Sequence, residues 1–169
     1  MQDQKPESDV KACALFAHCF TCSKNLKAVG NITKELAAGG VETLRFDFTG
    51  VGKSDGDFSD TNLSSNVYDL IAAYEFLKRG GSAPSILIGH SLGGVAILQA
   101  ASRMEAVKAV VTIGAPSDPG HGEHHFESIK EEIERTGEAV VKLAGRPFKV
   151  KKQFLDDLEG AKMEPQEIL

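Results

Sequence analysis

The hexapeptide GHSLGG at positions 89–94 has residues suited to nucleophilic catalysis. It directly follows an apolar, strand-like run and begins a segment of helical period, which is the context that a G-x-S-x-G nucleophile elbow requires. A serine on such a tight turn needs small residues two positions before and after it, and Gly89 and Gly93 meet that need. The pattern predicts Ser91 as a nucleophile, with the amide of Leu92 donating to a developing oxyanion. The alternative is a glycine-rich turn with a passive serine.

The sequence HCFTC at positions 18–22 follows the first apolar run of the chain. In a parallel sheet this loop leaves the same edge as the Ser91 turn, so the two segments can converge. We therefore expect the amide of Phe20 to be a second oxyanion donor. An ordinary strand-to-helix loop is the alternative.

The pair Cys19-x-x-Cys22 supports a different hypothesis. A C-x-x-C motif between a strand and a helix is also how thiol redox sites are built, because the helix end lowers the pKa of a thiol. A zinc site formed with His121, His124 and His125 is a weaker alternative, since the separation of the two groups is unlike the compact spacing of structural zinc sites. We expect no metal and no cofactor.

A further glycine-rich segment, DFTGVGKS at positions 47–54, ends like a phosphate-binding P-loop. That motif needs a glycine where Asp47 stands, and a dinucleotide-binding motif would need one at Asp55. Both nucleotide-binding interpretations therefore fail. We expect a tight turn in which Gly50 and Gly52 supply backbone freedom and Asp47 accepts hydrogen bonds from loop amides.

An active serine needs a histidine within hydrogen-bond reach to take its proton. His90 is expected to point away from the Ser91 hydroxyl, and His18 lies on the loop that carries the second oxyanion donor. The loop after the last strand-like run leaves the sheet beside the elbow, so we hypothesise that Asp118 and His121 form a substitute acid and base. The alternative that both are hinge residues is favoured, because such a pair must meet demanding geometry.

Short apolar runs alternate with longer segments of helical period, which is typical of a parallel sheet with crossover helices. We expect four strands, each nearly all apolar and therefore covered on both faces, at residues 12–17, 41–46, 85–88 and 107–113. Helices are expected at about 24–38, from Asn62 or Ser64 to the glycine pair 80–81, and from 92 to about 104, followed by a charged helix at 123–144 and an amphipathic segment at 151–162. The predicted fold class is α/β, a three-layer α/β/α domain with a mostly parallel sheet.

Composition restricts the classes of function. With 169 residues, 41% hydrophobic and 25% charged, the chain suits one folded domain. A net charge of −5 provides no basic surface for nucleic acid. No apolar run approaches the roughly 20 residues that cross a bilayer, so we expect no membrane partner. Three cysteines, an odd number crowded into positions 13–22, form a poor disulfide framework, and we expect a reducing, cytoplasmic location.

Taken together, the segments GHSLGG, DFTGVGKS and HCFTC, each after a strand-like run, resemble the α/β-hydrolase superfamily. More narrowly, HCFTCSK and GRPFKVKKQFLDDL are similar to the hydrolase half of proteins in which such a domain is fused to an OsmC-like domain. The resemblance covers nearly the whole chain from about Lys11. It implies a serine hydrolase that acts on small acyl esters through an acyl-enzyme on Ser91, with the amides of Phe20 and Leu92 as its oxyanion hole.

The resemblance also divides the chain. Residues 1–10 would be a polar N-terminal tail, 11–119 the hydrolase core, 120–163 a helical cap, and 164–169 the start of a further strand. The superfamily normally has a pair of antiparallel strands at the start, which we do not recognise here. It also carries the triad acid and histidine on later strands without counterparts here, so the chain would be inactive unless another group supplies the base. The alternatives are a non-catalytic fragment that binds a partner or a second copy of itself through open sheet edges, and a thiol redox protein using the C-x-x-C pair.

Overall fold

The computed structural model describes residues 2–4, 9–117, 126–143 and 145–161. Its core is a five-stranded sheet in the order β1-β3-β2-β4-β5. The strands are β1 (Gln2–Gln4), β2 (Ala12–Ala17), β3 (Val41–Arg45), β4 (Ile86–His90) and β5 (Ala109–Ile113). Strands β2 to β5 pair in parallel, and β1 is antiparallel to β3. The predicted α/β class with a mostly parallel sheet is confirmed.

Strand β1 corrects two expectations. Residues 1–10 are not wholly a polar tail, because Gln2–Gln4 pairs with residues 43–45 of β3, and this is an antiparallel strand before the first parallel one. Its hydrogen bonds come from the backbone, which every residue type carries. An all-polar strand of three residues therefore leaves no hydrophobic pattern to detect.

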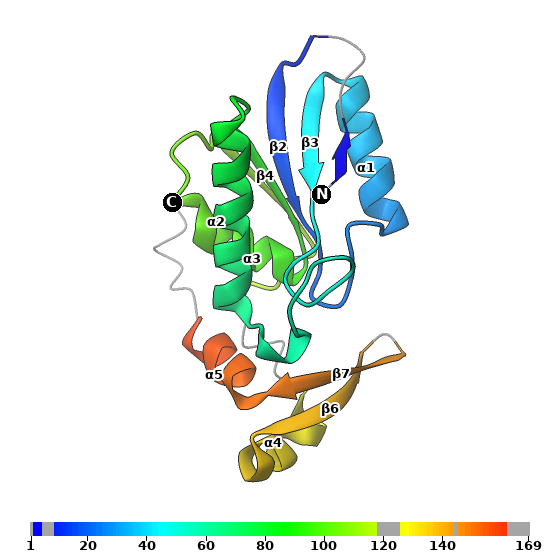
Figure 1. The fold of residues 1–169 in the computed structure, drawn as a ribbon, viewed down its shortest axis with the longest axis vertical. Helices are drawn as coiled ribbons and strands as arrows, with labels where there is room; N and C mark the ends of the chain where they lie inside the picture. Colours follow the sequence, from blue (N-terminus) through cyan, green and yellow to red (C-terminus); the bar gives the residue numbers. More distant parts are fainter. Residues whose placement is uncertain (1, 5–8, 118–125, 144, 162–169) are drawn as a thin grey trace.

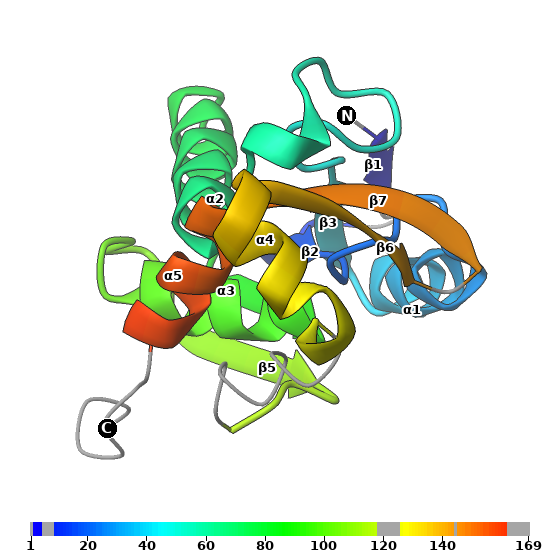
Figure 2. The ribbon, with the colours of Figure 1, turned by 90° about the horizontal axis from the view of Figure 1, so that it is seen from below.

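Helices cover both faces of the sheet (Figures 1 and 2). Helix α1 (Lys27–Ala38) packs on the face that presents Phe16 and Ile88. Helices α2 (Leu63–Arg79) and α3 (Leu92–Ala101) cover the opposite face, which presents Leu15 and Leu87. Neighbouring residues of one strand face opposite helices because side chains alternate along a strand. The apolar runs identified in the sequence are therefore buried from both sides at the centre of the sheet.

The helix starts have local causes. Helix α2 begins with a capping box, in which the Asn62 side chain accepts from the Ser65 amide at 2.8 Å and the Ser65 hydroxyl accepts from the Asn62 amide at 2.8 Å. Asn62 is thus the cap, one of the two residues predicted. Helix α1 begins at Lys27 rather than at Lys24, because Lys24 belongs to the buried ion pair described below.

Strand β5 differs from the expectation that every strand is covered on both faces. All five of its residues are exposed, and Val111 is 46% exposed. In the described sheet β5 is an edge strand that pairs with β4 alone, and α1 packs against the middle of the sheet rather than beside β5. The apolar sequence of β5 is that of a central strand, but its place in this structure is an open edge.

The segment after β5 is not an all-helical cap. Its described part contains a short 3-10 turn η3 (Glu127–Ile129), α4 (Lys130–Thr136), the antiparallel hairpin β6 (Glu138–Leu143) and β7 (Arg146–Lys151), and α5 (Lys152–Gly160). The predicted charged helix at 123–144 is wrong beyond Thr136, because Gly137 ends α4 with a φ of 84°. The β-branched residues that follow alternate between buried and exposed positions, as a strand requires.

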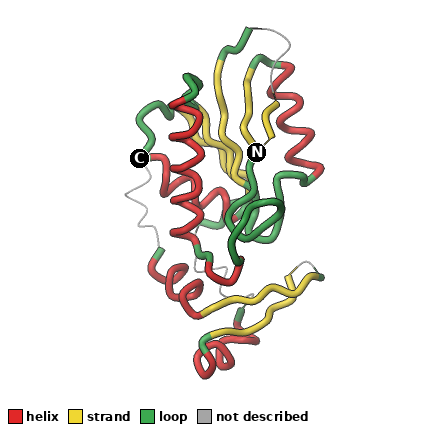
Figure 3. The backbone as a smooth tube through the Cα atoms, in the orientation of Figure 1, coloured by secondary structure: helices red, strands yellow, loops and turns green. Residues whose placement is uncertain are grey.

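The hairpin and its helices, which we call the cap segment (residues 126–161), lie at the end of the molecule toward which β3 points (Figures 1 and 3). The N-terminus of α2 holds α5 there, since Asp157 accepts from the Ser64 amide at 2.8 Å and from its hydroxyl at 2.5 Å. The 3-10 turn η1 (Phe58–Asp60) binds β7, where Lys151 forms an ion pair with Asp60. None of the helices in the described ranges has the length and hydropathy needed to span a bilayer.

Candidate active site

Ser91 lies between β4 and α3 in a backbone conformation that residues with side chains rarely adopt. Its φ is 53° and its ψ is −123°, and among the described residues no other non-glycine residue has a positive φ. A strained backbone of this kind costs on the order of 1–3 kcal/mol and persists where the surrounding structure imposes it. The Ser91 amide donates to the carbonyl of Ile113 at 2.9 Å, and its own carbonyl accepts from the Gly94 amide at 2.8 Å. The turn has the backbone geometry that a nucleophile elbow requires.

The glycines on either side of Ser91 are required by close backbone contacts. A Cβ atom on Gly89 would lie 2.5 Å from the carbonyl oxygen of Gly93. A Cβ atom on Gly93 would overlap the carbonyl oxygen of His18. The second contact also places the start of loop 18–22 directly against the Ser91 turn, as the parallel topology predicts.

The backbone amides of Phe20 and Leu92 share one property: neither donates a hydrogen bond to any residue that the structure describes. Leu92 is the first residue of α3, and the first amides of a helix have no partner inside it. Both side chains pack against one hydrophobic core. The two amides are therefore available to a ligand, and their part in an oxyanion hole stays a prediction.

His18 is buried and makes hydrogen bonds with both ring nitrogens. Its Nδ1 lies 2.8 Å from the carbonyl oxygen of Cys19, and its Nε2 accepts from the Phe48 amide at 3.3 Å. These partners define a neutral ring with its proton on Nδ1. Burial lowers the pKa of His18, although the Cys19 carbonyl and the charge of Asp47 act in the opposite direction. A ring engaged in this way ties two loops together and has no free nitrogen to act as a base.

Asp118 and His121 lie outside the described residues, as do His124 and His125. Strand β5, which precedes them in the chain, does lie beside the Ser91 turn, because it pairs with β4 and its Ile113 carbonyl accepts from the Ser91 amide. His90 is only partly exposed, and its buried Nδ1 finds no hydrogen-bond partner in the described part of the chain.

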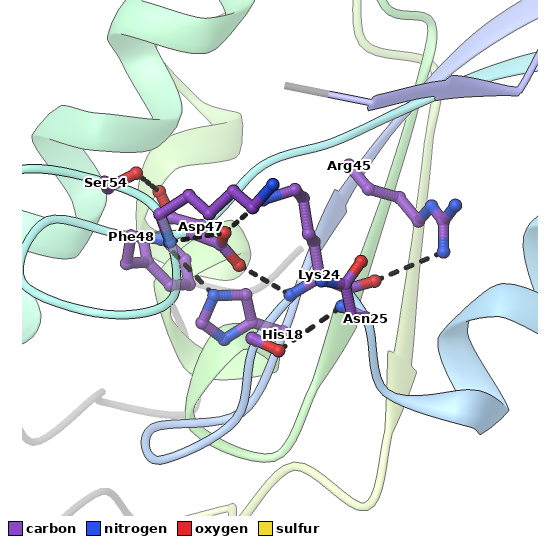
Figure 4. Close-up of polar contacts among 9 residues, drawn as sticks. His18, Lys24, Asn25, Arg45, Asp47, Phe48 and Ser54 are labelled. Atoms are coloured by element: carbon purple, nitrogen blue, oxygen red, sulfur yellow. Dashed lines mark hydrogen bonds and ion pairs between the residues drawn. The ribbon is translucent and has the colours of Figure 1, made fainter.

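Asp47 organises the loop that was compared with nucleotide-binding motifs (Figure 4). Its carboxylate accepts from the Lys24 amide at 2.7 Å and from the Lys53 amide at 3.1 Å, and it forms a buried ion pair with the Lys24 ammonium. Burial raises the pKa of Asp47, but the hydrogen bonds from Lys24 and Lys53 hold it below its ordinary value. Gly50 and Gly52 have φ values of 75° and 62°. The predicted tight turn, with Asp47 binding loop amides, is confirmed.

Sequence reasoning missed Lys24 and Arg45. Arg45 is buried in β3, and its Nη1 donates to the Lys24 carbonyl at 3.2 Å (Figure 4). Burial lowers the pKa of Arg45. An arginine in a strand that was expected to be covered on both faces was the available signal, since charged side chains are seldom buried without a partner. These contacts fix the end of the loop that carries Phe20.

The two cysteines of the C-x-x-C motif form a disulfide. Cys19 and Cys22 have Cα atoms 5.3 Å apart, and the Cys22 amide donates to the Cys19 carbonyl at 3.1 Å. The expectation that the cysteines make a poor disulfide framework is wrong for this pair, because the tight turn brings them together, while Cys13 is buried and lies outside the disulfide. No group of three or more potential metal ligands occurs among the described residues.

Phe20 also belongs to an aromatic cluster that joins this loop to the cap segment. Its ring stacks on Phe154 of α5 at 4.5 Å and contacts Phe58 of η1 at 4.9 Å, measured between ring centroids. Phe148 of β7 lies 4.9 Å from Phe58, and Phe126 lies 5.5 Å from Phe154. Aromatic pairs of this kind add to the stability that area burial already provides. The cap segment is thus packed onto the residue whose amide is a predicted oxyanion donor.

Comparison with known proteins agrees with this geometry. The Hydrolase_4 family, described as "Serine aminopeptidase, S33", matches residues 9–153. The rat mitochondrial palmitoyl-protein thioesterase ABHD10 is 35% identical over 98 residues, which make up 56% of this chain and 32% of that protein. The chain thus matches about a third of the length of that relative.

Solved structures show the same fold. The esterase domain of a Rhodothermus marinus protein is 48% identical, with a TM-score of 0.67 over 95% of this chain and 62% of that one. The Est1E protein of Butyrivibrio proteoclasticus, solved with ferulic acid, is 23% identical, with a TM-score of 0.77 over 94% of this chain and 66% of that one. Because the family match covers most of the residues, the chain belongs to the serine aminopeptidase S33 family of the α/β-hydrolase superfamily.

Proposed function

We propose that this chain acts as an esterase-like serine hydrolase, with Ser91 attacking the carbonyl carbon of a small acyl ester or thioester. The observation that carries the proposal is the positive φ of Ser91 on the tight turn between β4 and α3. Membership of a serine hydrolase family supports it. The R. marinus protein described as an esterase domain and the rat protein named as a thioesterase support the substrate class.

In the proposed mechanism, the Ser91 hydroxyl loses its proton to a base as its oxygen bonds to the acyl carbon. The amides of Leu92 and Phe20 stabilise the oxyanion, and loss of one such donor typically slows catalysis by about 10²–10³-fold. The alcohol or thiol leaves with the proton, and water then hydrolyses the acyl-enzyme. No step requires a cofactor or a metal.

The proposed acid and base are Asp118 and His121. The loop that carries them follows β5, which lies beside the elbow. His18 is excluded from this role because both of its ring nitrogens are engaged. If this pair does not act, the chain is inactive unless a base comes from elsewhere. A His121→Ala variant that keeps the hydrolysis rate would contradict the assignment.

The first test is labelling of the folded protein with a fluorophosphonate probe, followed by peptide mass mapping. Such probes react appreciably with activated serines, so we expect modification of the peptide that contains Ser91 and none in Ser91→Ala. Ser102→Ala is the matched control, since Ser102 is an exposed serine at the other end of α3. Absence of labelling on folded wild-type protein would overturn the proposal that the chain is catalytic by itself.

A second candidate function is binding through the open sheet edge, and the exposure of β5 favours it. All five of its residues are exposed and four of them are apolar, and an open apolar edge is a template for another strand. The partner proposed is a second copy of the chain. Light scattering should then give a dimer for wild type and a monomer for Val111→Lys, with Val140→Lys as the control at an exposed valine of β6. A well-folded wild-type monomer would contradict self-association.

The complete protein is proposed to join this hydrolase to an OsmC-like domain and to be cytoplasmic. The support is the resemblance of HCFTCSK and GRPFKVKKQFLDDL, together with the 48% identity to a protein described as an esterase domain. Immunoblotting of fractionated cells tests both points. A band at the mass of one hydrolase domain, or a band confined to an organelle, would contradict them.

A further inference from the structure

The loop between β2 and α1 contains a disulfide, and the two residues inside this disulfide contact the cap segment. Cys19 and Cys22 close it with a disulfide, and both cysteines are partly exposed. The two residues between them make the contacts to the cap segment. Phe20 stacks on Phe154 at 4.5 Å between ring centroids, and the Thr21 carbonyl accepts a hydrogen bond from Arg146.

The Cys19–Cys22 disulfide therefore lies next to two features of the molecule. One is the predicted oxyanion donor, the amide of Phe20, which donates to no residue in the described ranges. The other is the docking of the cap segment, through Arg146 at the start of β7 and Phe154 on α5. A disulfide limits the conformations open to the residues that it encloses. Opening it leaves hydrogen bonds as local restraints on the turn, from the Cys22 amide and from the His18 ring to the Cys19 carbonyl.

We infer that Cys19 and Cys22 form a reversible thiol–disulfide site whose oxidation state controls both the position of the Phe20 amide and the docking of the cap segment. The effect on catalysis rests on the proposed function, whereas the effect on docking does not. The co-reactants are of known chemical class: low-molecular-weight thiols or dithiols as reductants, and hydroperoxides as oxidants.

The chemistry balances in both directions. In reduction, a thiolate attacks one cysteine sulfur and forms a mixed disulfide, and a second thiolate releases it, so that two electrons pass to the protein and its two sulfurs gain protons. In oxidation, one cysteine thiolate attacks a hydroperoxide, the O–O bond breaks, an alcohol or water leaves, and a sulfenic acid forms; the other thiol then displaces water from it to reform the disulfide. Both cysteines are accessible enough for this exchange, whereas Cys13 is buried in β2.

The test compares oxidised and dithiothreitol-reduced protein by three measurements. Alkylation followed by mass spectrometry counts the thiols, and we expect two more after reduction under native conditions. Hydrogen exchange should show that residues 146–161 lose protection on reduction. Labelling at Ser91 should slow by about tenfold, because the oxyanion donor is loosened rather than removed. The Cys19→Ser/Cys22→Ser variant should behave as reduced protein in both conditions, and Cys13→Ala should respond like wild type.

The outcomes separate this inference from the proposed function. If Ser91 is labelled in neither state while residues 146–161 still lose protection on reduction, the hydrolase proposal fails and the site stands. If hydrogen exchange in 146–161 is the same in both states, the inference is wrong, whatever the labelling shows. It is equally wrong if the double serine variant still responds to dithiothreitol.

Discussion

Replacement of Asp47 by asparagine should strongly destabilise the fold, because it removes one charge of a buried ion pair. The side chains of Lys24 and Asp47 are 7% and 1% exposed. In Asp47→Asn, the Lys24 ammonium stays buried, and the new amide group presents a donor to it. Breaking a buried pair from one side typically costs about 3–5 kcal/mol, and a domain of this size has only about 5–15 kcal/mol in total.

Asp69→Asn provides the matched control. Its carboxylate also binds this loop, accepting from the Thr49 amide at 2.8 Å and from the Thr49 hydroxyl at 3.0 Å. No lysine or arginine of the described residues forms an ion pair with Asp69. In Asp69→Asn an amide replaces the carboxylate that accepts from the two Thr49 donors, so the unfolding free energy should fall by about 1 kcal/mol. Adding Lys24→Met to Asp47→Asn should recover part of the loss, because it removes the unpaired ammonium.

Urea unfolding followed by far-UV circular dichroism measures these differences, since the chain has no tryptophan for fluorescence. From highest to lowest unfolding free energy, the expected order is wild type, Asp69→Asn, the Lys24→Met/Asp47→Asn double variant, and Asp47→Asn. Equal losses in Asp47→Asn and Asp69→Asn would refute the argument from the buried ion pair. A double variant no more stable than Asp47→Asn would refute it as well.

Three further predictions concern pH, packing and the cap. Burial lowers the pKa of His18 from its ordinary 6.5, so the contribution of His18 to the unfolding free energy is complete above pH 6.5 and is lost as the pH falls toward the pKa of the folded state. Unfolding free energies measured across this range should show the loss in wild type and not in His18→Gln. Gly94→Ala should cost about 1–3 kcal/mol by crowding Ala115, whereas Gly160→Ala, with open space around it, should change thermal stability little. Phe154→Ala removes a buried ring and should cost about 3–5 kcal/mol in urea unfolding, with smaller losses in Phe154→Leu.

Much of the fold could be predicted because its signals are local. Apolar runs alternating with helical periods predict a parallel sheet, and the Asn62 cap predicts where α2 begins. Strand β1 and the β6–β7 hairpin could not be found in this way. The first lacks any apolar residue, and the second was hidden in a charged segment where Gly137 and the adjacent Val140 and Val141 were the available signals.

In the candidate site, too, some residues could be predicted from the sequence and others could not. The glycines around Ser91 and those after Asp47 are specified by sequence, because backbone conformations with positive φ and close backbone contacts exclude other residues. The ion-pair partner of Asp47 could not be predicted from the sequence. Lys24 is 23 residues away along the chain, and nothing local to either residue indicates their ion pair.

By itself, the sequence determined the turn at Ser91, the parallel arrangement of the central strands and the turn that follows Asp47. The tertiary structure alone decided that Lys24 and Arg45 are buried, that β5 is an open edge, that Cys19 and Cys22 pair, and that the cap segment packs on Phe20. The physical reason is the range of the forces involved. Steric limits on the backbone act within a few residues, whereas burial, ion pairing and aromatic contacts depend on segments brought together by folding.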